Sequence, residues 1–449
     1  MQPAIPHSST SVAQTRVTAK VFRRVIPFLV ICLVFHTLDR INLGFAALAM
    51  NKDLGLDPAV FGLAAGIGGI SYIIAEIPSN IAMSRFGARV WLSRIMITWG
   101  IAAAATALVV GPRSFFLVRF LLGLAEAGFL PGVFLYLTYW IPESSRARAT
   151  SIFLLAQPVT FVLGGAISGQ MLGMTGIAGL AGWKWLYILQ GLPAVALGIV
   201  GLFFLTDKPE KARWLSSSEK SELAAILGHH TDYVERGQWR LLPKVLRNPA
   251  VLLLGLAYFG LPSSLSSYAA WAPLIVQDVL PKAGFLRLGE ILALPPLVCV
   301  VVMSLWGKSS DRSGERVWHT VLPVLVAAAG WLLIAFSNTP VVRLLGLTAA
   351  ITGSFAAQAI FWTIATLAFP PHTRPVGIAT VSTIGLLGGA VSPFVVGVAN
   401  HAAGNFKGGL IWIASLLFVT AVCVLAASRR NTPRDEFPQE TQKASDRIV

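Results

Sequence analysis

Residues 114–140 read SFFLVRFLLGLAEAGFLPGVFLYLTYW, a stretch long and apolar enough to form one helix across a lipid bilayer. It carries Arg119 and Glu126, whose spacing of seven places both side chains on one helix face about 10 Å apart. A charge inside a membrane costs at least ~2.5 to 3.5 kcal/mol, so such residues usually mark a functional site. Gly123 and the small residues that follow allow a neighbouring helix or a ligand to approach this face. A salt bridge that serves packing alone is the structural alternative.

The composition of the whole chain agrees with a membrane location. Of its 449 residues, 55% are hydrophobic and only 12% are charged, with a mean hydropathy of +0.70. Soluble globular proteins do not have this balance, so the chain is expected to be a polytopic membrane protein. The polar first 20 residues lead into a long apolar run from Val25, which does not resemble a cleavable signal peptide. Cys32, Cys299 and Cys423 lie in apolar segments and are read as small buried hydrophobes.

Twelve apolar segments are long enough to span a bilayer, and they fall into two sets of six. The first set is 25–47, 58–82, 90–111, 114–139, 148–173 and 184–206, and the second is 249–276, 287–307, 317–337, 343–369, 376–401 and 407–427. The predicted organisation is therefore an N-terminal tail (1–24), a first half (25–206), a linker (207–247), a second half (248–428) and a C-terminal tail (429–449). In the linker, Ser216 to Ser218 are expected to cap a short helix with Glu219 and Glu222 in its first turns.

The basic residues indicate the orientation. Grouped by alternate loops, 26 of the 35 Lys and Arg residues lie on the side of both termini and 7 on the other, with Arg40 and Arg119 inside the membrane. Positive loops face the cytoplasm, so both termini and the linker are expected there, in a bacterial inner membrane. The charge of +15 is thus an orientation signal, and no nucleic-acid partner is expected.

A signature recurs after the second helix of each set. Residues 80–89 read NIAMSRFGAR and residues 307–316 read GKSSDRSGER, and both contain small residues followed by Arg, Gly and Arg. A parallel repeat of this kind is typical of carriers whose site lies between two rocking halves. We expect a gating role for Arg85, Gly87, Arg89, Gly307, Asp311, Arg312, Gly314 and Arg316. Gly307 should permit close helix approach, and Asp311 should accept from a facing helix N-terminus and pair with an Arg. Ser84 replaces this acid in the first copy, which predicts a weaker latch there.

These motifs carry a family resemblance. The signature GxxxDRxGxR at 307–316, with its altered copy at 80–89, resembles the loop signature of the major facilitator superfamily. Within it, FHTLDRINLGFAAL (35–48), SYIIAEIPSNIAMSRFGARVWLSRI (71–95), RFLLGLAEAGFLPG (119–132) and DKPEKARWL (207–215) resemble the anion:cation symporter family. Its members include bacterial sugar-acid (such as D-galactonate), tartrate, phthalate and hydroxyphenylacetate permeases. The resemblance covers Val25 to Ser428. It implies an all-α membrane protein with twelve transmembrane helices in two six-helix halves, the major facilitator fold.

Four charged residues form the candidate site. Helix arithmetic puts Asp39 and Arg40 about 21 Å from the cytoplasmic start of the first helix, level with Arg119, and Glu126 near the midplane. The resemblance implies that Asp39 and Glu126 handle protons and that Arg40 holds the substrate carboxylate. The ionised empty site is neutral. A bound monoanion gives it one negative charge and one proton removes that charge, which favours proton:anion symport. Simple neutralisation of Asp39 by Arg119 remains the alternative.

Several further residues are candidates for the lining of the site. In the resembled symporters, Tyr72 and Gln157 occupy substrate-contacting positions, and Ser382 is near the corresponding contact of the second half. Trp362, with Gln358, lies at a plausible cavity depth, and packing with a satisfied hydrogen bond is equally open for each of these residues. Thr37 and Ser382 depart from the sugar-acid pattern, which leaves the substrate open. His36 is assigned mainly to packing or lining, with a proton relay as the alternative, and Glu76 to a gate or helix-end contact.

The expected function is proton-coupled uptake of an organic carboxylate, such as a sugar acid, dicarboxylate or aromatic acid, by alternating access. The expected partners are the anion, protons and the lipid bilayer, and a monomer should suffice. An efflux antiporter of the same fold is the nearest alternative, although residues 156–169 lack the compact Gly-Pro and Gly-Gly pattern of drug antiporters. A non-transporting sensor also retains such a fold. No catalytic constellation, metal-ligand spacing or phosphate-binding loop occurs, so neither an enzyme nor a cofactor is expected.

Overall fold

The computed structural model describes residues 7–227, 245–369 and 373–429, and every regular element in these ranges is a helix. Twelve helical spans within the described residues are long and apolar enough to cross a membrane. The prediction of an all-α protein with twelve spans is confirmed. The C-terminal tail beyond residue 429 and residues 228–244 of the linker lie outside the described residues.

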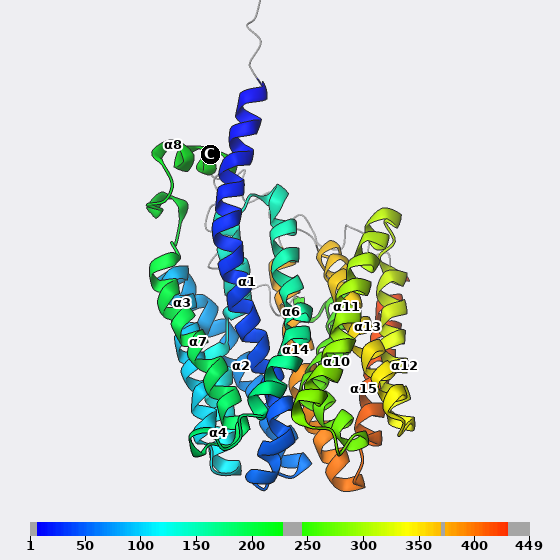
Figure 1. The fold of residues 1–449 in the computed structure, drawn as a ribbon. Helices are drawn as coiled ribbons and strands as arrows, with labels where there is room; N and C mark the ends of the chain where they lie inside the picture. The colour runs from blue at the N-terminus through cyan, green and yellow to red at the C-terminus, as the bar shows by residue number, and fades with distance from the viewer. Residues whose placement is uncertain (1–6, 228–244, 370–372, 430–449) are drawn as a thin grey trace, which may run out of the picture.

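The spans form two groups that stand side by side, with the N-terminal end of the chain and the linker at one end of the molecule (Figure 1). The first group contains α1 (His7–Asp53), α2 (Pro58–Phe86), α3 (Ala88–Ala105), η1 (Thr106–Leu108), α4 (Pro112–Glu126), α5 (Phe129–Trp140), α6 (Glu143–Leu172), η2 (Ile177–Gly179) and α7 (Gly182–Phe204). The linker contributes η3 (Pro209–Lys211) and α8 (Ser217–Leu227). The second group contains α10 (Pro249–Val279), α11 (Phe285–Ser313), α12 (Val317–Phe336), α13 (Pro340–Leu367), α14 (Arg374–Ala403) and α15 (Lys407–Arg429).

Local sequence explains where two of the spans, α2 and α10, begin. The Asp57 carboxylate accepts a hydrogen bond from Val60 N at 2.8 Å at the start of α2, and the Asn248 side chain accepts from Ala250 N at 2.9 Å at the start of α10. In both helices a proline follows the capping residue, where its fixed φ suits the first turn and its missing N–H costs nothing.

The linker helix that the sequence predicted is present, and it packs against an unexpectedly long α1. Ser216 and Glu219 form a capping box at the start of α8: Glu219 N donates to Ser216 Oγ at 3.2 Å and Ser216 N donates to Glu219 Oε2 at 2.8 Å. Lys20 Nζ pairs with Glu219 at 2.7 Å, and Val17 and Val21 are buried. These contacts hold part of the segment that the sequence assigned to a tail, and the helix itself begins at His7.

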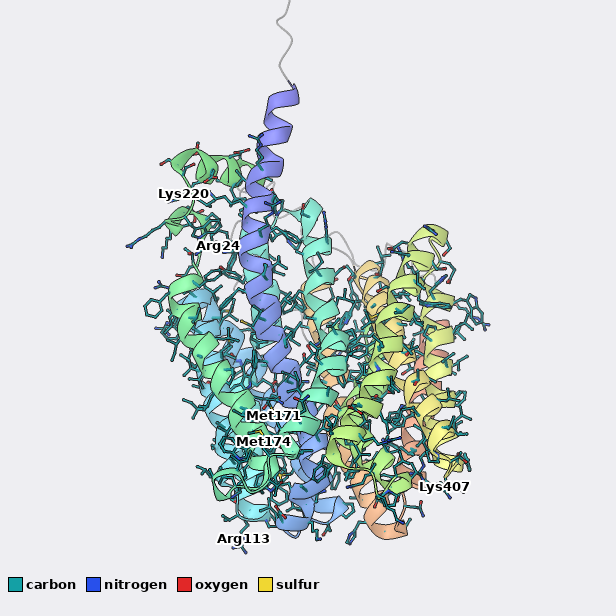
Figure 2. The ribbon with its side chains drawn as sticks, in the orientation of Figure 1. Arg24, Arg113, Met171, Met174, Lys220 and Lys407 are labelled. Carbon is teal, nitrogen blue, oxygen red and sulfur yellow. The ribbon has the colours of Figure 1, made fainter. Side chains whose placement is uncertain are left out.

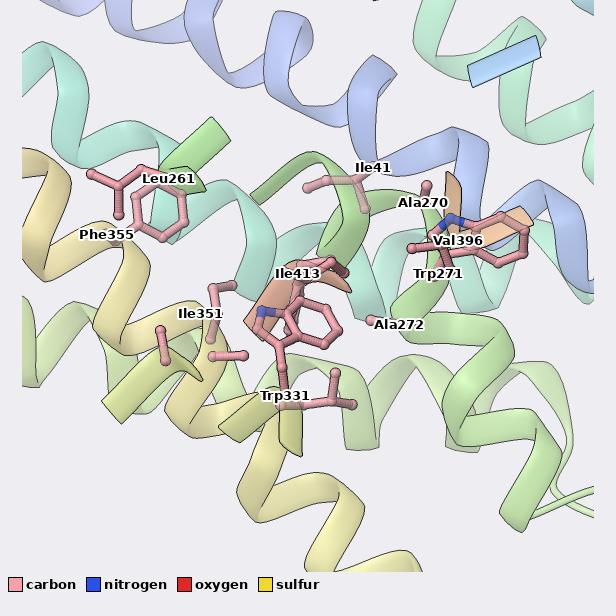
Figure 3. Packing of buried hydrophobic residues seen from close by; sticks show 14 of the residues in the cluster. Ile41, Leu261, Ala270, Trp271, Ala272, Trp331, Ile351, Phe355, Val396 and Ile413 are labelled. Carbon is pink, nitrogen blue, oxygen red and sulfur yellow. The ribbon is translucent and has the colours of Figure 1, made fainter. Parts of the chain in front are cut away.

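The two halves pack together at the end of the molecule that is remote from α8. There α1 meets α10, α2 meets α14 and α6 meets α11. Glycines permit the close approach, because a Cβ on Gly62 would lie 2.6 Å from Pro393 O and one on Gly165 would lie 2.6 Å from Gly289 O. Figure 3 shows part of this shared core, in which Ile41 of α1 lies among residues of the second half such as Ala270.

At the end that carries α8, the first half has a core of its own. A second cluster of buried apolar residues contains only residues of the first half and the linker, from Val17 and Phe28 of α1 to Leu223 of α8. The halves are therefore joined by shared packing at one end, while at the other the first half packs with the linker. This arrangement determines how the candidate site is reached.

Candidate substrate and proton site

The stretch at 114–140, expected to form one helix, is broken at its centre. Ala127 leaves the helical region with ψ 135°, and Gly128 follows at φ 87°, a left-handed conformation that favours glycine. Ser79 Oγ donates a hydrogen bond to Ala127 O at 2.7 Å, so the carbonyl released by the break is satisfied, as a membrane interior requires. Glu126 is the last residue of α4 and lies at this break.

Glu126 contacts two cationic or titratable side chains of α1. Its Oε1 atom lies 3.4 Å from Arg40 Nε and 2.8 Å from His36 Nε2, and Glu126 is buried, with 6% of its surface exposed. His36 is also buried, and its ring stacks on Phe129 with the centroids 5.0 Å apart. The sequence favours a packing or lining role for His36 and does not predict this contact, although His36 lies one helical turn before Arg40.

Arg40 is the accessible member of the group. Its side chain is 41% exposed although α1 is flanked by α6, α7 and α10. The guanidinium lies over the ring of buried Tyr72, with Cζ 5.4 Å from the centroid, a cation–π arrangement. Glu76, half-buried one turn further along α2, interacts electrostatically with Arg40. Because exposure of a charged group to lipid would be costly, we infer that Arg40, on a helix flanked by other helices, faces a space that solvent reaches.

Asp39 and Arg119 form the buried side of the group. Asp39 is 4% exposed and its Oδ1 atom is buried with no hydrogen-bond partner among the described residues. It interacts electrostatically with Glu126, Arg119 and Arg40. Arg119 Nε and the hydroxyl of Tyr187 are likewise buried without a partner in the part of the chain that the structure describes. Buried polar atoms are normally satisfied, so these atoms are suited to a ligand, water or a proton.

Small residues bring α2 against α4 beside these charges, as the sequence predicted. A Cβ on Gly123 would collide with Gly68 O and Ser71 Oγ, and one on Gly68 would come within 3.1 Å of Arg119 Nη2. Glycine at both positions therefore lets α2 approach the charged face of α4 and leaves room for the Arg119 guanidinium.

The predicted residues of the second half form a separate, uncharged group. Gln358 Nε2 donates to the Tyr258 hydroxyl at 3.0 Å, and the Trp362 ring packs edge-on against Tyr258 with centroids 4.6 Å apart. Two further candidates, Gln157 on α6 of the first half and Ser382 on α14 of the second half, are half-buried. Among the described residues, neither makes a hydrogen bond to the four charged side chains, so the geometry does not unite them with that group.

The first copy of the loop signature is joined by an acid from the linker that the sequence does not predict there. Gly87, at φ 88°, joins α2 to α3, and the Asp207 carboxylate lies where its Cβ would be. Arg89 N donates to Asp207 Oδ1 at 2.9 Å, at the N-terminus of α3. The linker thus supplies a carboxylate to the first signature, which has Ser84 where the second signature has Asp311. Arg85 is exposed, with its guanidinium 5.8 Å from the Phe86 ring.

The second copy differs from expectation in two respects. Asp311 pairs with Arg316 at 2.8 Å, but Glu315, not Asp311, caps the next helix by accepting from Trp318 N at 2.7 Å and His319 N at 3.0 Å. A Cβ on Gly307 would meet no atom within 4 Å, so Gly307 does not mediate close helix approach here. Gly314, at φ 69°, ends α11, and Arg312 is exposed beside Lys308.

The described residues contain no group of three His, Cys, Asp or Glu side chains that could hold a metal ion. The chemistry available at the site is that of three carboxylates (Asp39, Glu126 and, further along α2, Glu76), two guanidinium groups, one imidazole and two phenols. This set can bind an anion and exchange protons.

Comparisons with known proteins agree with this architecture. The family model described as "Major Facilitator Superfamily" matches residues 29–393. A putative tartrate transporter of Agrobacterium vitis is 41% identical over 416 residues, which cover 93% of this chain and 95% of that protein. A quinolone resistance transporter of Acinetobacter baumannii is 36% identical over 88% of this chain and 91% of its own.

Among solved structures, a bacterial homologue of the human lysosomal transporter Spinster superposes with a TM-score of 0.73 at 16% identity, covering 90% of this chain and 96% of that one. This similarity extends along both halves and concerns the fold. The relatives and structural neighbours are transporters and not enzymes. The chain therefore belongs to the Major Facilitator Superfamily and is a multi-pass membrane transporter.

Proposed function

We propose that the protein is a proton-coupled symporter that takes up an organic carboxylate, such as a sugar acid, dicarboxylate or aromatic acid. One observation supports this most directly: the exposed guanidinium of Arg40 lies against the buried carboxylate of Glu126, at 3.4 Å. An anion that enters the site meets a cation already next to a proton acceptor. The substantial identity to a protein named as a putative tartrate transporter supports a carboxylate substrate.

The geometry suggests how binding and protonation are linked. Arg40 grips a substrate carboxylate with its planar fork, and the substrate then competes with Glu126 for this guanidinium. Glu126 loses a positive partner and gains a negative neighbour, which favours its protonation. His36, 2.8 Å from Glu126 Oε1, is positioned to pass that proton. Asp39 is the second proton-handling group, and Arg119 keeps the occupied site neutral.

The remaining candidates have supporting roles in this proposal. Tyr72, Gln157, Trp362 and Ser382 contact the non-carboxylate part of the substrate. The two loop signatures act as gates at the end that carries α8. Because the halves share their core at the opposite end, the described conformation is the one open toward α8. We propose the division into tails, two halves and a linker that the sequence predicts, with α1 starting as a helix at His7 within the first tail. We propose that the chain works as a monomer.

We further propose that the protein lies in a bacterial inner membrane with both termini and the linker in the cytoplasm. This rests on the distribution of Lys and Arg over the loops. Cysteines introduced at Ser217 and at Asn51 should react with impermeant thiol reagents from opposite sides of the membrane. Labelling of both from outside intact cells would contradict the orientation.

A proton-coupled efflux antiporter is the second candidate, because one relative is named as a quinolone resistance transporter. A sensor that binds without transport is the third. Proteoliposomes loaded at pH 7.5 and diluted into pH 5.5 buffer separate the three. A symporter accumulates labelled tartrate or another carboxylate in response to the gradient. An antiporter extrudes a preloaded fluoroquinolone under the same gradient, because protons that enter drive the drug outward. A sensor does neither while still binding its ligand.

A further inference from the structure

A cavity of about 890 Å³ lies outside the charged site, at the end of the molecule that carries the linker. It is formed by the first turns of α1, the last turns of α7 and one residue of the linker. Its lining residues are Arg16, Ala19, Lys20, Arg23, Arg24, Pro27, Phe28, Ile31, Leu197, Val200, Phe204 and Trp214. Figure 2 shows Arg24 beside α1, between the linker and the bundle of spans.

The lining residues of α1 follow one stripe of the helix and change character along it. Arg16, Lys20, Arg23, Pro27 and Ile31 recur at intervals of three or four, so they lie on one face. The three basic residues come first and the two apolar residues follow toward the membrane interior. From Arg23 to Ile31 the helix rises by about 12 Å, which separates the charged part of the cavity from its apolar part.

The charged part of the cavity has an excess of positive charge. Lys20 is paired with Glu219 at 2.7 Å, but neither Arg16 nor Arg23 makes an ion pair or hydrogen bond with any described residue. The Arg24 guanidinium lies between two rings, 4.3 Å from the Phe204 centroid and 5.0 Å from that of Trp214. Arg24 Nε is buried and has no hydrogen-bond partner within the described ranges. The cavity therefore offers unmatched donors and cations to an anionic group.

The apolar part of the cavity faces the bilayer. Ile31 is 45% exposed and Val200 is 49% exposed, on neighbouring helices. A soluble anion such as phosphate would leave this surface uncovered, whereas an acyl chain would cover it. Basic groups directly above an apolar surface at a membrane boundary match the layered chemistry of a phospholipid.

We propose that this cavity binds one anionic phospholipid, with its phosphate on Arg16, Arg23 and Arg24 and an acyl chain along Ile31 and Val200. The site is separate from the transport site, and its occupant is selected by headgroup charge and by the presence of an acyl chain. A zwitterionic lipid of the same chain length binds more weakly because its net charge is zero.

The test uses the purified full-length protein in detergent, with native mass spectrometry as the readout. Phosphatidylglycerol should be retained as one molecule per chain more strongly than phosphatidylcholine with identical acyl chains. The variant carrying Arg16→Gln and Arg23→Gln should bind phosphatidylglycerol about 25-fold more weakly, at about fivefold for each cation removed. The variant Arg16→Lys with Arg23→Lys should retain most of the affinity.

A matched control separates this site from general surface charge. Arg247→Gln with Arg429→Gln removes two exposed basic residues that lie outside the cavity, at the start of α10 and the end of α15. This control should leave phosphatidylglycerol binding unchanged. Val200→Trp fills the apolar part at an exposed position, so it should weaken binding of phosphatidylglycerol while leaving all basic residues in place.

Four outcomes would overturn the proposal. Equal retention of phosphatidylcholine, or an equal loss of binding in the control variant, would show that no selective site exists here. Displacement of phosphatidylglycerol by inorganic phosphate at equal concentration would assign the cavity to a soluble anion. Binding that appears only after removal of residues 430–449 would show that this segment of the chain occupies the cavity.

Discussion

The two halves of the transporter share a fold but differ in the chemistry that they present. The first half contributes Asp39, Arg40, Arg119 and Glu126, a group with equal numbers of acidic and basic side chains. The second half contributes the uncharged trio of Tyr258, Gln358 and Trp362. The difference suggests a division of labour, in which the first half binds charge and couples protons and the second half recognises the shape of the substrate.

The largest effect is expected from Glu126→Gln, which mimics the protonated carboxyl permanently. Uptake driven by an inward proton gradient should fall to the level of protein-free liposomes, because the carrier cannot release the proton. Exchange of labelled for unlabelled substrate should survive, because the loaded carrier remains neutral and can reorient. Both assays are run on the same proteoliposomes.

The pairing of these two results within one variant is decisive. Full gradient-driven accumulation in Glu126→Gln, or loss of exchange in a folded protein, would transfer the coupling role to Asp39. Asp39→Asn serves as the comparison, because Asp39 adjoins Arg40 and its loss should alter affinity as well as coupling.

Arg40→Lys should have the next largest effect. The substitution keeps the charge but loses the planar fork, so substrate affinity should fall by about 1.5 to 3 kcal/mol, the value of a hydrogen bond to a charged group. Isothermal titration calorimetry with the transported carboxylate measures this change. An unchanged Kd would remove Arg40 from the binding site and weaken the assignment of charge recognition to the first half.

A smaller effect of a different kind is expected in the second half. Gln358→Leu removes the 3.0 Å hydrogen bond to Tyr258 and should reduce affinity by about 0.5 to 1.5 kcal/mol. The number of protons moved per substrate should remain that of the wild-type protein. A change in this ratio, measured from the reversal potential of uptake, would show that coupling is not confined to the first half.

The smallest effect concerns the helix cap in the second loop signature. Burial opposes ionisation of Glu315, but hydrogen bonds from His319 and from Trp318 N and His319 N outweigh it and hold the pKa of this carboxyl below its ordinary value. A lowered pKa gives stability that is present above the ordinary value of about 4.3 and is lost as the pH falls through the lower folded value.

Wild-type protein should therefore be more stable than Glu315→Gln at neutral pH, and the difference in Tm should shrink on acidification below about pH 4.3. Asp207→Asn is the matched change in the first signature, where the acid comes from the linker. A difference in Tm that is independent of pH would show that the Glu315 carboxylate does not act through its charge.

The sequence by itself determined the twelve spans and, apart from the early start of α1, their boundaries to within a few residues. These properties depend on composition and on the fixed rise of 1.5 Å per residue, both of which are local. The capping box of α8 was also readable, because Ser216 and Glu219 are three positions apart. The family followed from motifs that lie within single helices and loops.

Only the tertiary structure decided which of these side chains touch. The break at Ala127 depends on Ser79 of another helix, which satisfies the released carbonyl at 2.7 Å. The contact of His36 with Glu126 depends on the rotation of α1 against α4, which hydropathy does not encode. Asp207 reaches Arg89 across 118 residues of chain. Such contacts arise from packing between elements distant in sequence, so no local pattern predicts them.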